Sequence, residues 1–159
     1  MIFSITGAKL YIGGVITDPD KEFEPSDFNG QDWLRISETE NLGSVGDMSR
    51  EIEWKDTGRS RTIRVKGSRT GTVMELICGL SVECPGQLAL IQAETTNNNY
   101  AFRLVFNDAP EGGTPSERLF VARVGNIIED YSNDDEVVRF NAPLWVNSNL
   151  VRINASAPD

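Results

Sequence analysis

Histidine is absent from the 159-residue sequence. This absence excludes Ser-His-Asp and Cys-His nucleophile pairs, zinc sites with histidine ligands, and general acid–base catalysis by imidazole. Glycine-rich phosphate loops are missing too, because Gly43–Gly46 and Gly67–Gly71 match neither the dinucleotide-binding nor the Walker A pattern. Paired carboxylates could still serve a glycosidase, but no segment locates a cleft for them. We therefore expect a protein that is not an enzyme.

Cysteine is scarce, with Cys78 and Cys84 as the two examples. Their separation is not CxxC spacing, and two thiols cannot complete a four-ligand zinc site. A disulfide is one alternative, but so few cysteines are more typical of small buried side chains in a reducing compartment. The sequence therefore predicts no metal and no cofactor.

Long apolar runs are also absent. No stretch approaches the about 18 residues that a membrane-spanning helix needs. The segment Met1–Gly7 has neither the charged start nor the apolar run of a secretory signal. We expect no membrane partner and synthesis in a cytoplasm.

Positive charge is outnumbered, since 15 Lys and Arg face 24 Asp and Glu and the net charge is −9. Such a chain is a poor candidate for wrapping nucleic acid, because that affinity comes mainly from neutralising phosphates. The same sign suits a surface that a polyanion must pass without sticking. The length favours a single domain over residues 1–159.

Short runs rich in β-branched and aromatic residues recur between turn clusters, a pattern typical of an all-β domain. The clearest is Glu136–Ser148, where apolar and polar residues alternate. Its expected partner is Arg118–Ile128, a run typical of a strand buried on both faces, and Glu129–Asp135 is expected as the turn between them. Further strands are predicted at Lys9–Ile16 (with a bulge at Gly13-Gly14), Thr72–Leu80 and Tyr100–Asn107.

One helix is predicted at about residues 85–95, because Pro85 suits a first helical position and Leu88 and Ile91 follow at helical spacing. A helix this short would cover an open edge or end of the sheet and would not form a second layer.

A charged hairpin arm is predicted at about residues 47–66, turning at Thr57-Gly58. On its first strand Ile52 and Trp54 share one face, as do Ile63 and Val65 on its second. The basic residues fall on both faces, which implies that both sides are wet and that the arm projects from the body or pairs only in an assembly. A simple soluble hairpin remains the alternative. The basic stripe comprises Arg59, Arg61, Arg64, Lys66 and Arg69.

Two acidic segments, Asp18–Asp27 and Glu129–Glu136, could in principle hold a hard cation. The first fails the EF-hand pattern, because Phe23 and Asn29 occupy the positions that require Gly and Glu. A solvated loop and a turn are the favoured interpretations. Either segment could instead meet the basic arm of a second copy.

Several short segments follow one another in a characteristic order over about residues 32–151. These are Asp32–Ile36, Leu42–Asp47, the charged arm, Lys66–Thr72, Pro85–Leu90, Tyr100–Phe106, Leu119–Gly125 and the final alternating strand. Taken together, this order resembles the major tail tube protein of lambda-like, long-tailed (siphovirus) bacteriophages.

The resemblance implies a mainly β fold, a β-sandwich or barrel with one short flanking α-helix and a long charged hairpin arm. It also implies hexameric rings that stack into the hollow tube through which DNA passes during ejection. The implied partners are other copies of the chain and the tape measure, tail tip and tail terminator proteins, in a virion tail assembled in the host cytoplasm.

Charge and alternation then suggest roles within such a tube. We expect Arg59, Arg61, Arg64 and Lys66 at inter-ring contacts, and Glu51, Glu53 and Asp56 near the lumen or at the same junction. Charge reversal of Arg61 and Arg64 is expected to block tube growth and leave the fold intact.

Two other function classes stay open. One is the tube protein of a type VI secretion or contractile-injection system, which shares the ring logic. The other is a β-sandwich carbohydrate-binding module, with Trp33, Trp54 and Trp145 as a stacking platform. Burial of these tryptophans in a core or interface is the favoured interpretation, because single large aromatic residues usually pack.

Overall fold

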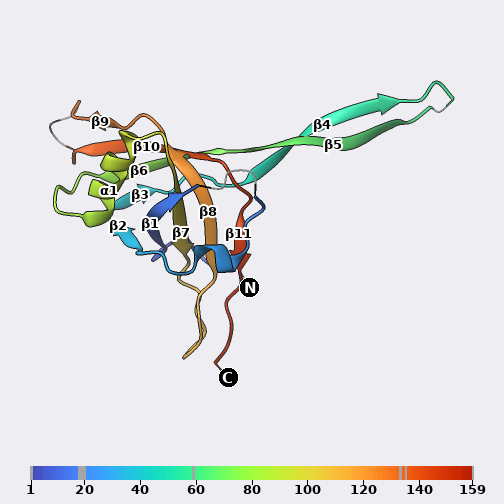
Figure 1. Ribbon diagram of the computed structural model, residues 1–159. Helices are drawn as coiled ribbons and strands as arrows, with labels where there is room; N and C mark the ends of the chain where they lie inside the picture. The colour runs from blue at the N-terminus through green and yellow to red at the C-terminus, as the bar shows by residue number, and fades with distance from the viewer. Residues whose placement is uncertain (1, 18–20, 59, 133, 135, 159) are drawn as a thin grey trace.

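A computed structural model describes residues 2–17, 21–58, 60–132, 134 and 136–158. Figure 1 shows a β-rich body from which one long hairpin projects. The body elements are β1 (Lys9–Ile16), the 3-10 helix η1 (Pro25–Phe28), β2 (Leu34–Ile36), β3 (Thr39–Asn41), β6 (Val73–Gly79), α1 (Pro85–Glu94), β7 (Asn99–Val105), β8 (Glu117–Val124), β9 (Ile128–Asp130), β10 (Arg139–Val146) and β11 (Val151–Ile153). The hairpin is formed by β4 (Asp47–Lys55) and β5 (Thr62–Gly71). The mainly β fold with one α-helix is confirmed.

The body is a nine-stranded sheet in the order β2-β1-β7-β8-β10-β6-β3, with β11 beside β8 and β9 beside β10. Alternation along β10 explains its core, because Phe140, Ala142, Leu144 and Val146 are all buried there. A second, smaller hydrophobic cluster lies on the other face of β7 and β8. There Phe28 of η1 and Phe23, which precedes η1, cover the two strands. Strand β8 is therefore buried on both faces, as its sequence predicts.

Several predicted strand bounds need correction. The strand expected at Glu136–Ser148 spans only Arg139–Val146, and its expected partner ends at Val124. The two do pair, through Leu144 opposite Val124. The expected turn at Glu129–Asp135 is partly wrong, because β9 includes Glu129 and Asp130 and pairs with β10; residues 133 and 135 lie outside the described part. The register of β1 against β7 shifts between Ile12 and Val15, where Gly13-Gly14 predicted a bulge.

Helix α1 packs on the edge strand β2, but not through the residues that its sequence suggests. Leu88 is 50% exposed, whereas Gly86, Gln87, Leu90 and Ala93 are buried. A Cβ on Gly86 would lie 2.1 Å from the Arg35 carbonyl oxygen, so only glycine allows this close approach.

Gln87 links helix α1 to the segments that follow β2 and β6. Its Nε2 donates to the carbonyl oxygens of Ser37 and Gly79, both at 2.9 Å, and its Oε1 accepts from the Ser81 N–H at 2.8 Å. The side chain is completely buried, so these bonds satisfy an amide that water cannot reach.

Cys78 and Cys84 are free and buried, which confirms the interpretation as small buried side chains and excludes the disulfide alternative. Burial raises the pKa of the Cys78 thiol to about 12. No helix in the described part of the chain is long and apolar enough to cross a membrane.

Candidate assembly surface

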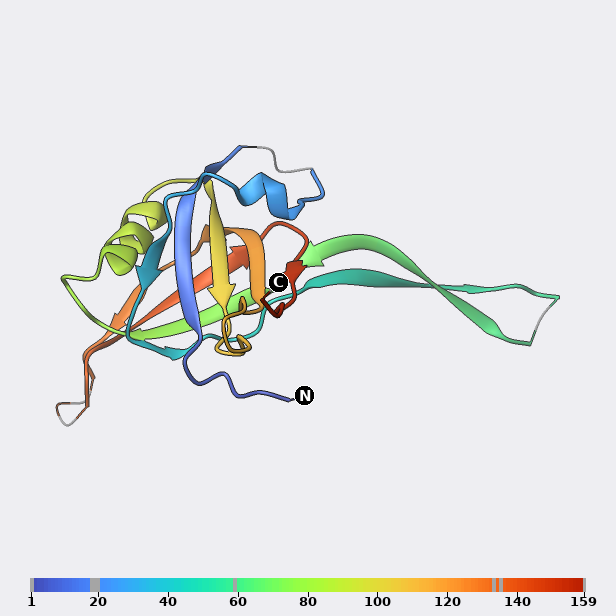
Figure 2. The same cartoon turned by 90° about the horizontal axis from the view of Figure 1, so that it is seen from below.

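The arm, predicted at about residues 47–66, extends further to Gly71, because β5 continues to that residue. Residues 47–71, called the arm from here on, continue two strands of the body. Strand β3 pairs with β6, and the same two chain segments pair again as β4 and β5. Where the body meets the arm, the Thr72 N–H donates a hydrogen bond to the Gly46 carbonyl oxygen at 3.0 Å. The backbone hydrogen bonding between the two segments therefore continues from the body into the arm. A Cβ on Gly71 would lie 2.0 Å from the Val146 carbonyl oxygen, so the arm root lies directly against the end of β10. Figure 2 shows the arm leaving the body at this point.

A bulge lies halfway along the arm. The register shifts between Ser49 and Glu51, which leaves Gly67 and Ser68 opposite Arg50. A Cβ on Gly67 would lie 2.7 Å from Ile52 Cδ1, so the glycine gives the isoleucine room on this strand pair.

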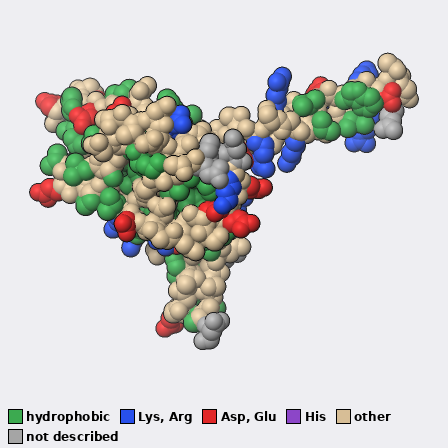
Figure 3. Space-filling view, in the orientation of Figure 1, with side chains coloured by type: hydrophobic (Ala, Val, Ile, Leu, Met, Phe, Trp, Pro, Cys, Tyr) green, Lys and Arg blue, Asp and Glu red, His purple; other side chains and the backbone are tan. Residues whose placement is uncertain are grey.

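Beyond the bulge the arm has one apolar face. Ile52 lies opposite Val65 and Trp54 opposite Ile63, and directly opposed residues project to the same side. Trp54 is 55% exposed and Val65 is 50% exposed. Both faces of the arm are therefore exposed to solvent, as predicted, but one of them is apolar. Figure 3 shows the hydrophobic side chains gathered toward the far end of the arm.

The opposite face carries the charges, with Glu51 across from Lys66 and Glu53 across from Arg64. Arg64 Nε lies 2.5 Å from Glu51 Oε1 and 3.4 Å from Glu53 Oε1. Because these side chains are more than half exposed, each pair is worth only about 0–1 kcal/mol. Glu51 and Glu53, two of the three predicted acidic residues, therefore bind Arg64 of their own subunit.

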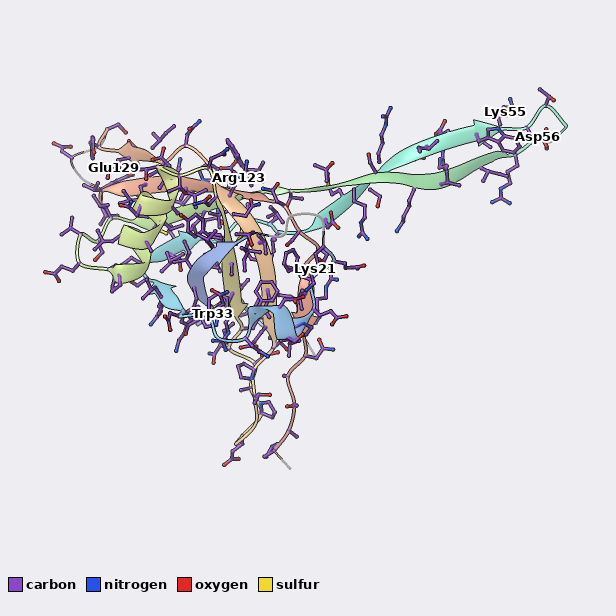
Figure 4. All side chains as sticks on the ribbon, in the orientation of Figure 1. Lys21, Trp33, Lys55, Asp56, Arg123 and Glu129 are labelled. Atoms are coloured by element: carbon purple, nitrogen blue, oxygen red, sulfur yellow. The ribbon has the colours of Figure 1, made fainter. Side chains whose placement is uncertain are left out.

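At the end of the arm the chain turns at Thr57-Gly58, as predicted. Asp56 Oδ1 accepts a hydrogen bond from the Gly58 N–H at 3.0 Å, a local bond typical of turns led by aspartate. Arg61 follows the turn and is exposed, and Arg59 lies outside the described residues. Figure 4 places Lys55 and Asp56 at the far tip of the arm.

Charge is divided unequally between arm and body. Residues 47–71 contain seven Lys and Arg against four Asp and Glu, a net charge of +3. The rest of the chain contains eight against twenty, a net charge of −12. A positive arm on a strongly negative body is attracted to the body of another copy.

An open groove of about 910 Å³ lies where β3, β6 and β10 meet, lined by Glu38–Glu40, Gly79–Ser81 and Glu136–Arg139. Arg139 Nε lies 2.5 Å from Glu40 Oε2, and its Nη1 lies 2.7 Å from Glu136 Oε2. These hydrogen bonds, first the one to Glu40, raise the pKa of Arg139. Glu38 forms no ion pair with any described residue, so the groove keeps a negative rim.

The other sequence candidates lie apart. Within the described residues no group of Asp, Glu and Cys is arranged to hold a metal ion, the described parts of both acidic segments included. The three tryptophans form no common platform. Trp54 is on the arm, Trp33 packs against the second cluster, and Trp145 is on the outer side of β10 beside Gly125. Burial in a core is wrong for Trp54 and for Trp145, which is 44% exposed. Burial in an interface stays a prediction for both.

No family model and no curated protein matches this sequence. Solved structures do match its fold. A chain of the six-fold symmetrised baseplate of the anti-feeding prophage has a TM-score of 0.67 at 9% identity, over 97% of each chain. The SPP1 tail tube has a TM-score of 0.59 at 15% identity, over 98% of this chain and 81% of the other.

A chain of the sheath–tube complex of the PVC extracellular contractile injection system has a TM-score of 0.61 at 12% identity, over 96% of this chain and 92% of the other. The fold defined by these matches is that of tail tube and injection-system proteins, and it spans nearly the whole of this chain.

The apolar face of the arm is the feature that sequence reasoning missed. The sequence did predict that Ile52 and Trp54 share one face of the first strand and that Ile63 and Val65 share one face of the second. Whether the two pairs lie on the same side of the hairpin depends on the register, in which Lys55 lies opposite Thr62, and the length of the turn sets this register.

Proposed function

We propose that this chain is the structural subunit of a tube, in which six copies form a ring and rings stack into the hollow tail of a long-tailed bacteriophage. The observation that carries the proposal is the arm, whose exposed apolar face projects from a body with the tail tube fold. A two-stranded hairpin has no core of its own, so another subunit must bury these side chains. The six-fold symmetry of the matching baseplate motivates the number of copies.

In this proposal the arm enters the adjacent ring. Its apolar face makes one contact with that ring. Arg59, Arg61, Arg64 and Lys66 are proposed for inter-ring contacts as well, with Arg64 and Lys66 on the opposite face of the arm. Glu51 and Glu53 belong to the ring junction more than to the lumen, because both bind Arg64. Arms and ring edges together should bury an interface above roughly 2,000 Å², the size of obligate assemblies.

The negative body suits a conduit for DNA. With a net charge of −12 outside the arm, a wall built from these bodies repels phosphates and lets DNA pass during ejection. The tube would sit in the virion tail after assembly in the host cytoplasm. Its partners would be a tape measure protein inside, a tip protein at one end and a terminator at the other.

A second candidate is the tube of a contractile-injection system. The chain from the anti-feeding prophage baseplate favours it, because its TM-score of 0.67 exceeds the 0.59 of the SPP1 tail tube. Gold-labelled antibodies against this chain distinguish the two. Label on tails attached to DNA-filled heads supports the phage tail, and label on headless particles with a sheath supports the injection system.

Negative-stain microscopy of the purified chain, with sedimentation velocity on the same samples, tests the shared claim. We expect rings or hollow tubes as the concentration rises. A chain that stays monomeric across all concentrations and salts contradicts the proposal.

A further inference from the structure

The arm and the groove occupy opposite ends of the molecule. The arm root lies at the end of β10 near Val146, and the groove lies at its beginning near Arg139. Both ribbon views show the arm on one side of the body and the β9–β10 end on the other. In Figure 4, Asp56 at the arm tip and Glu129 on β9 mark the two extremes.

Exposed apolar side chains line one side of the groove. Val137 is 67% exposed and Val138 is 41% exposed, and Ile128 is exposed on the neighbouring strand β9. The Leu80 N–H donates to the Val138 carbonyl at 2.8 Å, which holds the floor of the groove on the sheet. Clustered apolar side chains with a polar rim are typical of a protein interaction site.

We propose that this groove receives the arm of a second copy of the chain, so that subunits join head to tail along the tube. The inference rests on the proposed function and adds to it the receiving surface. The apolar face of the arm fits the exposed side chains of Val137 and Val138 in the groove. The net positive charge of the arm is attracted to the rim formed by Glu38, Glu40 and Glu136.

Charge complementarity selects this occupant. The arm carries a net +3, and the groove presents three carboxylates against the single guanidinium of Arg139. The arm cannot fold back into the groove of its own subunit, because it leaves the body at the opposite end. A contact between two different surfaces of one chain is heterologous, and such contacts propagate where they do not close into a ring.

Growth by this contact makes the tube polar, with free arms at one end and free grooves at the other. A protein that caps the arm end must present an acidic, apolar groove. A protein that caps the other end must present a cationic, apolar segment.

Cysteine cross-linking tests the contact, because Cys78 and Cys84 are buried and leave little background. Chains carrying Val65→Cys on the arm are mixed with chains carrying Val137→Cys at the groove, assembled and oxidised. The matched controls replace Val137→Cys with Val73→Cys, on β6 at the arm root, or Val15→Cys on β1, both exposed valines.

We expect a disulfide-linked dimer of Val65→Cys with Val137→Cys at several-fold higher yield than with either control. The inference is overturned if tubes form without this dimer, or if the control pairs give the same yield of dimer. Either result leaves the proposed function standing. Absence of tubes by microscopy overturns both.

Discussion

Trp54 tests the apolar face of the arm most sharply, because it is large and its side chain has no core to enter. With 55% of it exposed, and with tryptophan offering up to about 250 Å², roughly 130 Å² remain for burial in a contact. At about 25 cal/mol per Å² this area contributes about 3 kcal/mol to each arm contact. Since 1.4 kcal/mol corresponds to about a tenfold change, Trp54→Ala should raise the critical concentration for tube formation roughly 100-fold.

The same substitution should hardly change the stability of the free chain, within about 0.5 kcal/mol, because Trp54 lies outside both body clusters. Critical concentration is measured by pelleting, and stability by urea unfolding. Trp54→Phe is the matched control and should keep most of the affinity. Assembly of Trp54→Ala at the wild-type concentration would refute the reasoning, and so would a global loss of stability.

Three other predictions concern the arm and the body. Arg64→Glu places three carboxylates on one face of the arm and should weaken assembly more than Arg61→Glu, with urea unfolding unchanged in both; equal effects in pelleting contradict the ion-pair geometry. Gln87→Leu leaves an N–H and two carbonyls without their partner and should cost about 3 kcal/mol in urea unfolding, and a loss below the error of the fit contradicts it. Hydrogen bonds from the Ser116 hydroxyl and N–H lower the pKa of Asp108, so its contribution to stability is present above the unfolded pKa of about 3.9 and is lost as pH falls through the lower folded pKa. Asp108→Asn should therefore be less stable than wild type at pH 7 and nearly equal to it at the acid end, and a constant difference across pH contradicts this sign.

Local patterns in the sequence were sufficient to predict much of the body. Strand β10 was predictable because one residue type faces the core at every second position. The helix was predictable from Pro85 and the run that follows, and it spans Pro85–Glu94. The side of the helix that is buried was not predictable. Gly86 is buried because the Arg35 backbone lies close to it, and Gln87 is buried because its side chain forms hydrogen bonds, and a search for apolar residues detects neither.

The candidate surface was only half predictable. The charges of the arm were evident from composition, and so was its position between two body strands. Which residues share a face required the cross-strand register, and the bulge at Gly67 depends on contacts between strands. The groove combines residues near positions 38, 80 and 137, which only the fold brings together.

Cryo-electron microscopy of the assembled chain tests the central claim most directly, because it gives both the symmetry and the path of the arm. We predict a hollow tube of six-fold rings in which each arm crosses into the next ring with Trp54 buried. Rings whose arms stay within their own layer, or a chain that forms no tube at any concentration, would contradict the account.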